Sequence, residues 1–183
     1  MAYLVALTVI EIACHAIGFL SPNSNLFISH FYFVFQFVFL SILFYQLFEN
    51  KTIKRTIVLI LALQLAVLSM IYFSNPQLFW EFNFYEIVSC SSILVIYALL
   101  FIIKNFEKEH KYFNFSVGLI LYLICSISIF TSGNLRMVLW EDPFIDIWIF
   151  NSIFYIIFQY MIFREYIYFT KVNNKSLEDK LLL

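Results

Sequence analysis

Five ionisable side chains fall inside long apolar stretches of the sequence, where a charge is costly unless it is paired or hydrated. These side chains are Glu11, His15, His30, Glu86 and Asp146. Carboxylates and imidazoles transfer protons and accept hydrogen bonds, and in larger sets they ligate zinc or other divalent metals. Each of the five is therefore a candidate site residue.

Glu11 and His15 are four residues apart, so a helix would place them one turn from each other on the same face. In one interpretation the two side chains only satisfy each other. In the other they lie at the floor of a ligand site, where their coupled titration responds to ligand charge or external pH.

Stripes of polar side chains at helical spacing continue in later apolar stretches, where Ser89 and Cys90 follow Glu86, and Asn151 follows Trp148. We expect the stripes to converge on one site. The ligand-binding residues predicted on this basis are Glu11, His15, His30, Glu86, Tyr122, Asp146, Trp148 and Asn151.

More specific chemistry has no supporting motif. A metal site built from Glu11, His15, His30 and Glu86 would lack HExxH or a comparable spacing. A haem held by His15 and His30 would need both rings to face inward at one depth. A serine hydrolase would need a nucleophile elbow, and the sequence has none. We therefore expect no catalytic residue, no metal and no cofactor.

Some candidates also have a simpler explanation, because they lie near the ends of apolar stretches. Glu86 and Asp146 would reach water by extending toward the interface, and His30 would be an interfacial histidine without a role. Glu11 and His15 would then be a structural pair. These alternatives remain open at the level of sequence.

The composition is that of a membrane protein. Of 183 residues, 63% are hydrophobic and only 13% are charged, whereas about a quarter of the residues of a soluble domain are charged. The net charge of −1 offers no basic face for nucleic acid. Three widely spaced cysteines without a CxxC form neither a disulfide framework nor a zinc signature.

Six apolar stretches are long enough to cross a bilayer, which takes about 20 residues. They cover residues 2–20, 27–47, 56–74, 83–104, 112–131 and 144–164. The fold class predicted is all-α, an integral membrane bundle of six transmembrane helices in one domain, residues 1–165. Residues 166–183 are expected to form a frayed cytoplasmic tail with a break at VNNKS.

The positive charges predict the orientation of the bundle. Ten of the 11 Lys and Arg residues fall in the second and fourth loops and the C-terminal region, and only Arg136 falls on the other side. Both ends are therefore expected in the cytoplasm. The five ionisable candidates then lie between the midplane and the outer face, which predicts a polar cavity opening outward. The third helix, with Gln64 alone among apolar residues, is expected to be peripheral and to leave the cavity to the other five.

Three stretches resemble a loose group of small bacterial membrane proteins with six or seven helices and unassigned activity, often encoded beside sensor histidine kinases. The stretches are NLFISHFYFVFQFVFLSILFYQLF, YFNFSVGLILYLICSISIFTSGN and WIFNSIFYIIFQYMIF. The residues that match the group's pattern are Glu11, Asn25, His30, Tyr32, Glu86, Trp148 and Asn151. Members often carry a further helix at the front, which this sequence does not show. The resemblance implies a sensory or accessory membrane module.

The leading expectation is a non-enzymatic module of the bacterial inner membrane. It would lie in the lipid bilayer, bind a small or lipid-like ligand in the outer cavity, and act through a membrane protein partner such as a sensor kinase. The alternative is a membrane-embedded enzyme, lipid-directed or metal-dependent, that uses Glu11, His15 and Glu86.

Overall fold

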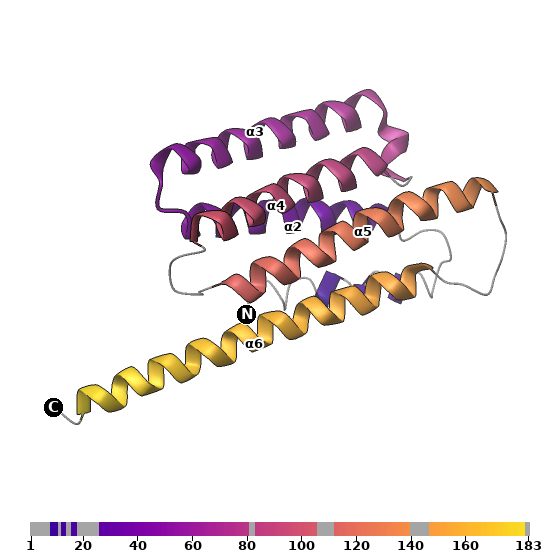
Figure 1. Cartoon of the computed structure of the whole chain (residues 1–183). Helices are drawn as coiled ribbons and strands as arrows, with labels where there is room; N and C mark the ends of the chain where they lie inside the picture. The colour runs from indigo at the N-terminus through magenta and orange to yellow at the C-terminus, as the bar shows by residue number, and fades with distance from the viewer. Residues whose placement is uncertain are drawn as a thin grey trace. The chain divides into compact units, whose positions relative to one another are not determined.

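The computed structural model describes residues 8–10, 12–13, 16–17, 26–80, 83–105, 112–139 and 147–181 (Figure 1). Side chains are described in these ranges except at 26, 28–29, 132–139, 147–150 and 171–181. The described part of the chain consists of helices and short connections. It divides into two compact units, Met1–Tyr97 and Ala98–Leu183.

The first unit holds three long helices and a short 3₁₀ turn. These elements are α2 (Leu26–Leu47), α3 (Lys51–Ser74), η1 (Pro76–Phe79) and the greater part of α4 (Phe84–Asn105). The residues before α2 are helical at 8–10, 12–13 and 16–17. In lipid every backbone polar group must be satisfied within the protein, which favours helices for such apolar sequences.

Local signals set the boundaries of α3. Asn50 begins the helix, because its side chain accepts hydrogen bonds from the backbone N–H groups of Thr52 and Ile53. Pro76 stands at the start of η1 and lacks the N–H that a continuing helix needs. Residues 51–55, three of them basic, were predicted to be part of a loop but form the first turn of α3.

The helices of the first unit pack through aromatic and aliphatic faces. Phe37, Leu40 and Phe44 repeat at helical spacing in α2 and are fully buried. Phe44 meets Tyr97 of α4 with ring centroids 6.1 Å apart. The opposite surfaces stay apolar as well: Met70 and Phe73 of α3 are 68% and 88% exposed. Apolar side chains on the outside fit a lipid environment.

The second unit pairs α5 (Phe113–Leu139) with α6 (Ile147–Leu181), which run in opposite directions (Figure 1). Tyr122 stacks on Phe158 with centroids 5.5 Å apart and lies 5.8 Å from the ring of Tyr155. Gly118 allows the close approach, because a Cβ there would lie 2.8 Å from Sδ of Met161. Small residues at such crossings are typical of helix pairs in membranes.

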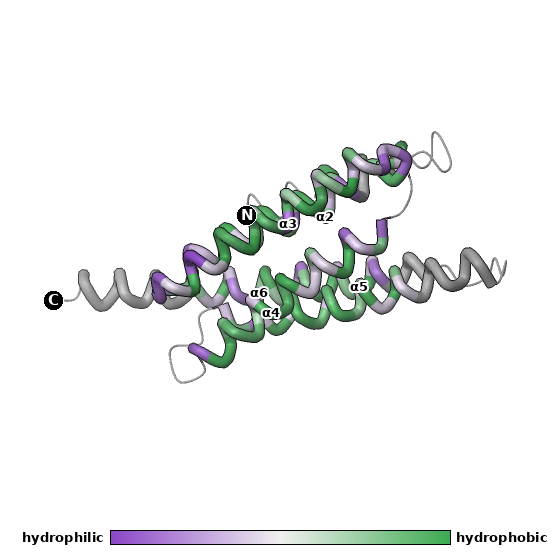
Figure 2. Tube along the Cα trace, turned by 90° about the horizontal axis from the view of Figure 1, so that it is seen from above, coloured by the Kyte–Doolittle hydropathy of each residue, from purple (hydrophilic) through white to green (hydrophobic). Residues whose placement is uncertain are grey.

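Four of the described helices have segments long and apolar enough to cross a membrane, namely His30–Leu47, Lys51–Ser74, Phe84–Asn105 and Phe113–Thr131. These correspond to four of the six predicted stretches. Figure 2 shows hydrophobic residues along most of their length. The protein is thus a helical bundle with membrane-spanning character.

Two predictions about the second unit are wrong. The segment 132–139, predicted to be part of a polar loop, continues α5. The VNNKS segment does not break the chain, since α6 is a continuous helix of 35 residues that includes most of the tail predicted to be frayed. Residues on both sides of these segments form helix readily, and two adjacent Asn residues cost only a few tenths of a kcal/mol each.

Candidate functional site

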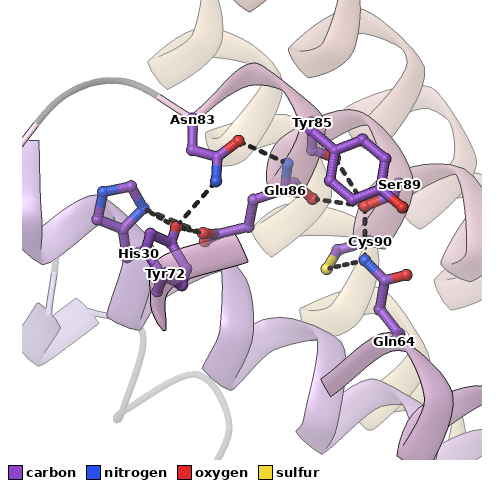
Figure 3. Close-up of polar contacts among 8 residues, drawn as sticks. All are labelled: His30, Gln64, Tyr72, Asn83, Tyr85, Glu86, Ser89 and Cys90. Atoms are coloured by element: carbon purple, nitrogen blue, oxygen red, sulfur yellow. Dashed lines mark hydrogen bonds and ion pairs between the residues drawn. The ribbon is translucent and has the colours of Figure 1, made fainter. Parts of the chain in front are cut away.

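Three helix ends of the first unit bring together His30, Tyr72 and Glu86 (Figure 3). His30 lies near the start of α2, Tyr72 near the end of α3, and Glu86 in the first turn of α4. The antiparallel course of consecutive helices places these three ends side by side. We refer to His30, Tyr72 and Glu86 as the triad.

One carboxylate oxygen joins the three residues. Oε2 of Glu86 lies 3.0 Å from Nδ1 of His30 and also accepts a hydrogen bond from the hydroxyl of Tyr72. Nδ1 of His30 lies 2.9 Å from the hydroxyl oxygen of Tyr72. An ionised carboxylate only accepts, so with Glu86 ionised it is Nδ1 of His30 that carries a proton and donates to both oxygens.

Asn83 completes the network from the start of α4. Its side-chain oxygen accepts from the backbone N–H of Glu86 at 3.3 Å, as a helix cap does. Its Nδ2 donates to the hydroxyl oxygen of Tyr72 at 3.2 Å. Asn83 thereby places Glu86 at a helix N-terminus, where the helix dipole stabilises a negative charge.

Two members of the triad are buried and Tyr72 is half-buried, and the carboxylate is only partly satisfied. Glu86 is 0% exposed and His30 is 5% exposed. Oε1 of Glu86 has no hydrogen-bond partner among the described residues. Desolvating such an acceptor without a partner costs about 1–3 kcal/mol or more. Glu86 therefore holds one buried acceptor that the described residues leave unsatisfied.

Aromatic side chains cover the triad. Phe79, the last residue of η1, stacks on the imidazole of His30 with ring centroids 5.6 Å apart. It also contacts the ring of Tyr72 edge-on, with ring centroids 6.1 Å apart. Trp80 follows, 5.6 Å from both Phe27 and Phe79, and is 65% exposed. The aromatic cover thus reaches from the buried triad to the surface of the unit.

A second polar group lies deeper along α3 and α4 (Figure 3). Gln64 donates to Oγ of Ser89 at 2.6 Å and approaches Sγ of Cys90 at 3.7 Å. The hydroxyl of Ser89 donates to the backbone oxygen of Tyr85 at 2.6 Å. Ser89 is therefore oriented by the backbone and by Gln64, which is unlike the serine of a Ser-His-acid hydrolase.

The predicted site residues are divided between the two units. His30 and Glu86 form a direct pair in the first unit, and Glu86 does not extend to water as one alternative held. Tyr122 of α5 and Asn151 of α6 belong to the second unit, where Ser126 donates to Oδ1 of Asn151 at 2.9 Å. Glu11, His15, Asp146 and the side chain of Trp148 lie outside the described residues.

The sequence prediction missed Tyr72 and Asn83. It treated α3 as peripheral, yet Tyr72 brings this helix into the site. The signal was present, because Gln64, Leu68 and Tyr72 follow each other in steps of four and continue one face. Asn83 and Glu86 form an Asn-x-x-Glu pattern, a variant of the capping box at a helix start.

No group of three or more His, Cys, Asp and Glu side chains that suits a metal ion occurs in the part of the chain that the structure describes. The triad offers one imidazole, one carboxylate and one phenol, a set suited to hydrogen bonding and proton transfer. Comparisons with protein-family models, curated proteins and solved structures find no match.

Proposed function

We propose that the protein is a sensory or accessory module of the bacterial inner membrane, whose triad binds a small or lipid-like ligand from the outer face. The observation that carries the proposal is the state of Glu86. It is fully buried, shares one oxygen with His30 and Tyr72, and has a second oxygen without a partner among the described residues.

The distance between the triad and the basic residues of α3 supports a location of the triad at the outer face of the membrane. Lys51, Lys54 and Arg55 mark the start of α3, and Tyr72 lies near its end. A helix of 24 residues is roughly 36 Å long, about the thickness of a bilayer core. With the basic end in the cytoplasm, as the distribution of Lys and Arg predicts, the triad lies at the outer interface.

The chemistry of the triad favours a ligand that donates a hydrogen bond. The spare oxygen of Glu86 accepts from an ammonium or hydroxyl group, and a cation gains more because the acceptor is charged. The faces of Phe79 and Trp80 suit an apolar or cationic body next to that donor. An amphiphile with an ammonium head meets both requirements.

The effect of ligand binding would be transmitted to a protein partner by a change in the arrangement of the helices. A donor that engages the spare oxygen of Glu86 shares one carboxyl group with His30 and Tyr72, whose contacts with Glu86 connect α4 to α2 and α3. The relative stability of two arrangements of the three helix ends would then depend on the ligand. The continuous α6 is about 52 Å long, which is longer than a bilayer core. Its end would therefore extend into the cytoplasm and offer a surface to a membrane protein partner such as a sensor kinase.

A fluorescence titration tests the proposal. With Trp140 and Trp148 replaced by Phe, Trp80 is the single tryptophan and reports on the aromatic cover. We expect a saturable change in its emission with ethanolamine or choline, and none with acetate. Glu86→Gln should remove the change. An equal response in Glu86→Gln, or no saturable response to either ammonium compound, would contradict the proposal.

A further inference from the structure

Tyr45 of α2 and the first three turns of α3 line an open groove at the end of the first unit that carries basic residues. Its volume is about 460 Å³, within the usual range for small-molecule sites. The residues that line it combine cations, an aromatic ring and apolar side chains: Tyr45, Lys51, Lys54, Arg55, Val58, Leu59 and Ala62.

The lining residues of α3 lie on one helical face in a polar-to-apolar order. Lys51, Lys54 and Arg55 occupy the first turn, and Leu59 and Ala62 follow on the same face in the next two turns. Leu59 is 60% exposed. The groove thus offers positive charge at its mouth and apolar surface along its floor, which matches the two parts of an anionic amphiphile.

The charge at the mouth comes from side chains that point into the groove. Nζ of Lys54 lies over the ring of Tyr45, 5.1 Å from its centroid, which holds the ammonium group at the groove. The first backbone N–H groups of α3 are taken by the side chain of Asn50. An anion would therefore be held by the three cations, while Glu49 in the same connection lowers their net charge to +2.

We propose that this groove binds the headgroup of an anionic phospholipid, with one acyl chain lying along the apolar face of α3. A helix with membrane-spanning length places its first turn at the headgroup level. Basic pockets at this level attract anionic lipids. The exposed apolar side chains of α3 provide a continuous surface for the chain of the lipid. The site is separate from the triad and does not depend on the function proposed for it.

Native mass spectrometry of the full chain in mild detergent tests the site. The probes are phosphatidylglycerol and phosphatidylcholine with the same acyl chains. We expect preferential retention of phosphatidylglycerol, and a loss of roughly fivefold in its binding for each charge removed by Lys51→Gln, Lys54→Gln and Arg55→Gln. The matched control replaces the other predicted cytoplasmic cluster, Lys104, Lys108 and Lys111, and should keep the preference.

A second variant separates the groove from surface charge alone. Ala62→Trp fills the apolar floor at an exposed position and leaves all three cations in place. We expect it to lose the preference for phosphatidylglycerol. An unchanged preference for phosphatidylglycerol in Ala62→Trp would overturn the proposal. So would an equal loss of phosphatidylglycerol binding in the groove variants and in the control variant, or displacement of the lipid by inorganic phosphate at the same concentration.

Discussion

Two buried glutamates, one in each unit, show how different partners give one side chain different roles. Glu86 and Glu165 are 0% and 4% exposed, and each has one carboxylate oxygen without a partner among the described residues. The bonded oxygen of Glu86 meets side chains of two other helices. The bonded oxygen of Glu165 accepts from the backbone N–H of Tyr112 at 2.6 Å, directly before α5.

The contact with the backbone N–H of Tyr112 indicates a structural role for Glu165. A carboxylate at the N-terminus of α5 satisfies a backbone group that the helix leaves open, and it interacts favourably with the helix dipole. Tyr112 has a φ of 61°, an unusual conformation for a residue other than glycine, and its ring packs 5.0 Å from Phe169. Glu165 therefore joins α6 to the start of α5, whereas Glu86 joins α4 to side chains of α2 and α3.

The largest effect is expected from removal of the triad carboxylate. Glu86→Ala leaves the Nδ1–H of His30 and the hydroxyl of Tyr72 without their shared acceptor. Loss of one member of a buried pair costs about 3 kcal/mol or more. The free energy of unfolding in mild detergent with added SDS measures this loss. Glu49→Ala, at an exposed position, is the control, and an equal effect of both variants would show that the triad does not hold the three helices.

An intermediate effect is expected at the crossing of α5 and α6. Gly118→Leu forces a side chain against Met161 and Phe158, which a Cβ alone would approach to 2.8 Å and 3.3 Å. Overpacking of this kind costs about 1–3 kcal/mol. The same unfolding measurement applies, with Leu121→Ala on the exposed face of α5 as control. If the two variants lose equal stability, close packing does not hold the second unit together.

The smallest effect is expected at the hydrogen bond between Ser126 and Asn151. A double-mutant cycle of Ser126→Ala and Asn151→Ala should give a coupling of about 0.6 kcal/mol, the average for such bonds in membranes. The response of Trp80 to ethanolamine should stay intact in Asn151→Ala. Loss of that response would place Asn151 in the ligand site, as the sequence predicted, and would remove the contrast between the units.

Much of the helical architecture could be predicted from the sequence. The predicted stretches 27–47 and 83–104 differ from α2 and α4 by no more than one residue at either end. The prediction placed the start of α3 five residues late, because hydropathy marks where a helix enters the lipid and not where it is capped. The same reason explains why the ends of α5 and α6 were predicted too early, since both helices continue past their apolar segments into polar sequence.

The sequence predicted two residues of the site but not the contact between them. His30 and Glu86 were both identified as buried ionisable residues, but they are 56 residues apart. No local spacing indicates such a contact, whereas the spacing of Glu11 and His15 suggested a pair within one helix. Tyr72 was overlooked because a tyrosine near the end of an apolar helix is usually an interfacial residue. Its role follows only once three helix ends meet.

The most direct test of the central claim compares Glu86→Gln with Glu165→Gln in the protein that retains Trp80 as its single tryptophan. Both substitutions keep shape and one acceptor oxygen, and both replace a buried carboxyl group by an amide. Thermal unfolding and the Trp80 response to ethanolamine are measured on the same preparations. We expect both variants to fold, with the response lost in Glu86→Gln and retained in Glu165→Gln. Equal responses in the two variants would contradict a ligand role for Glu86.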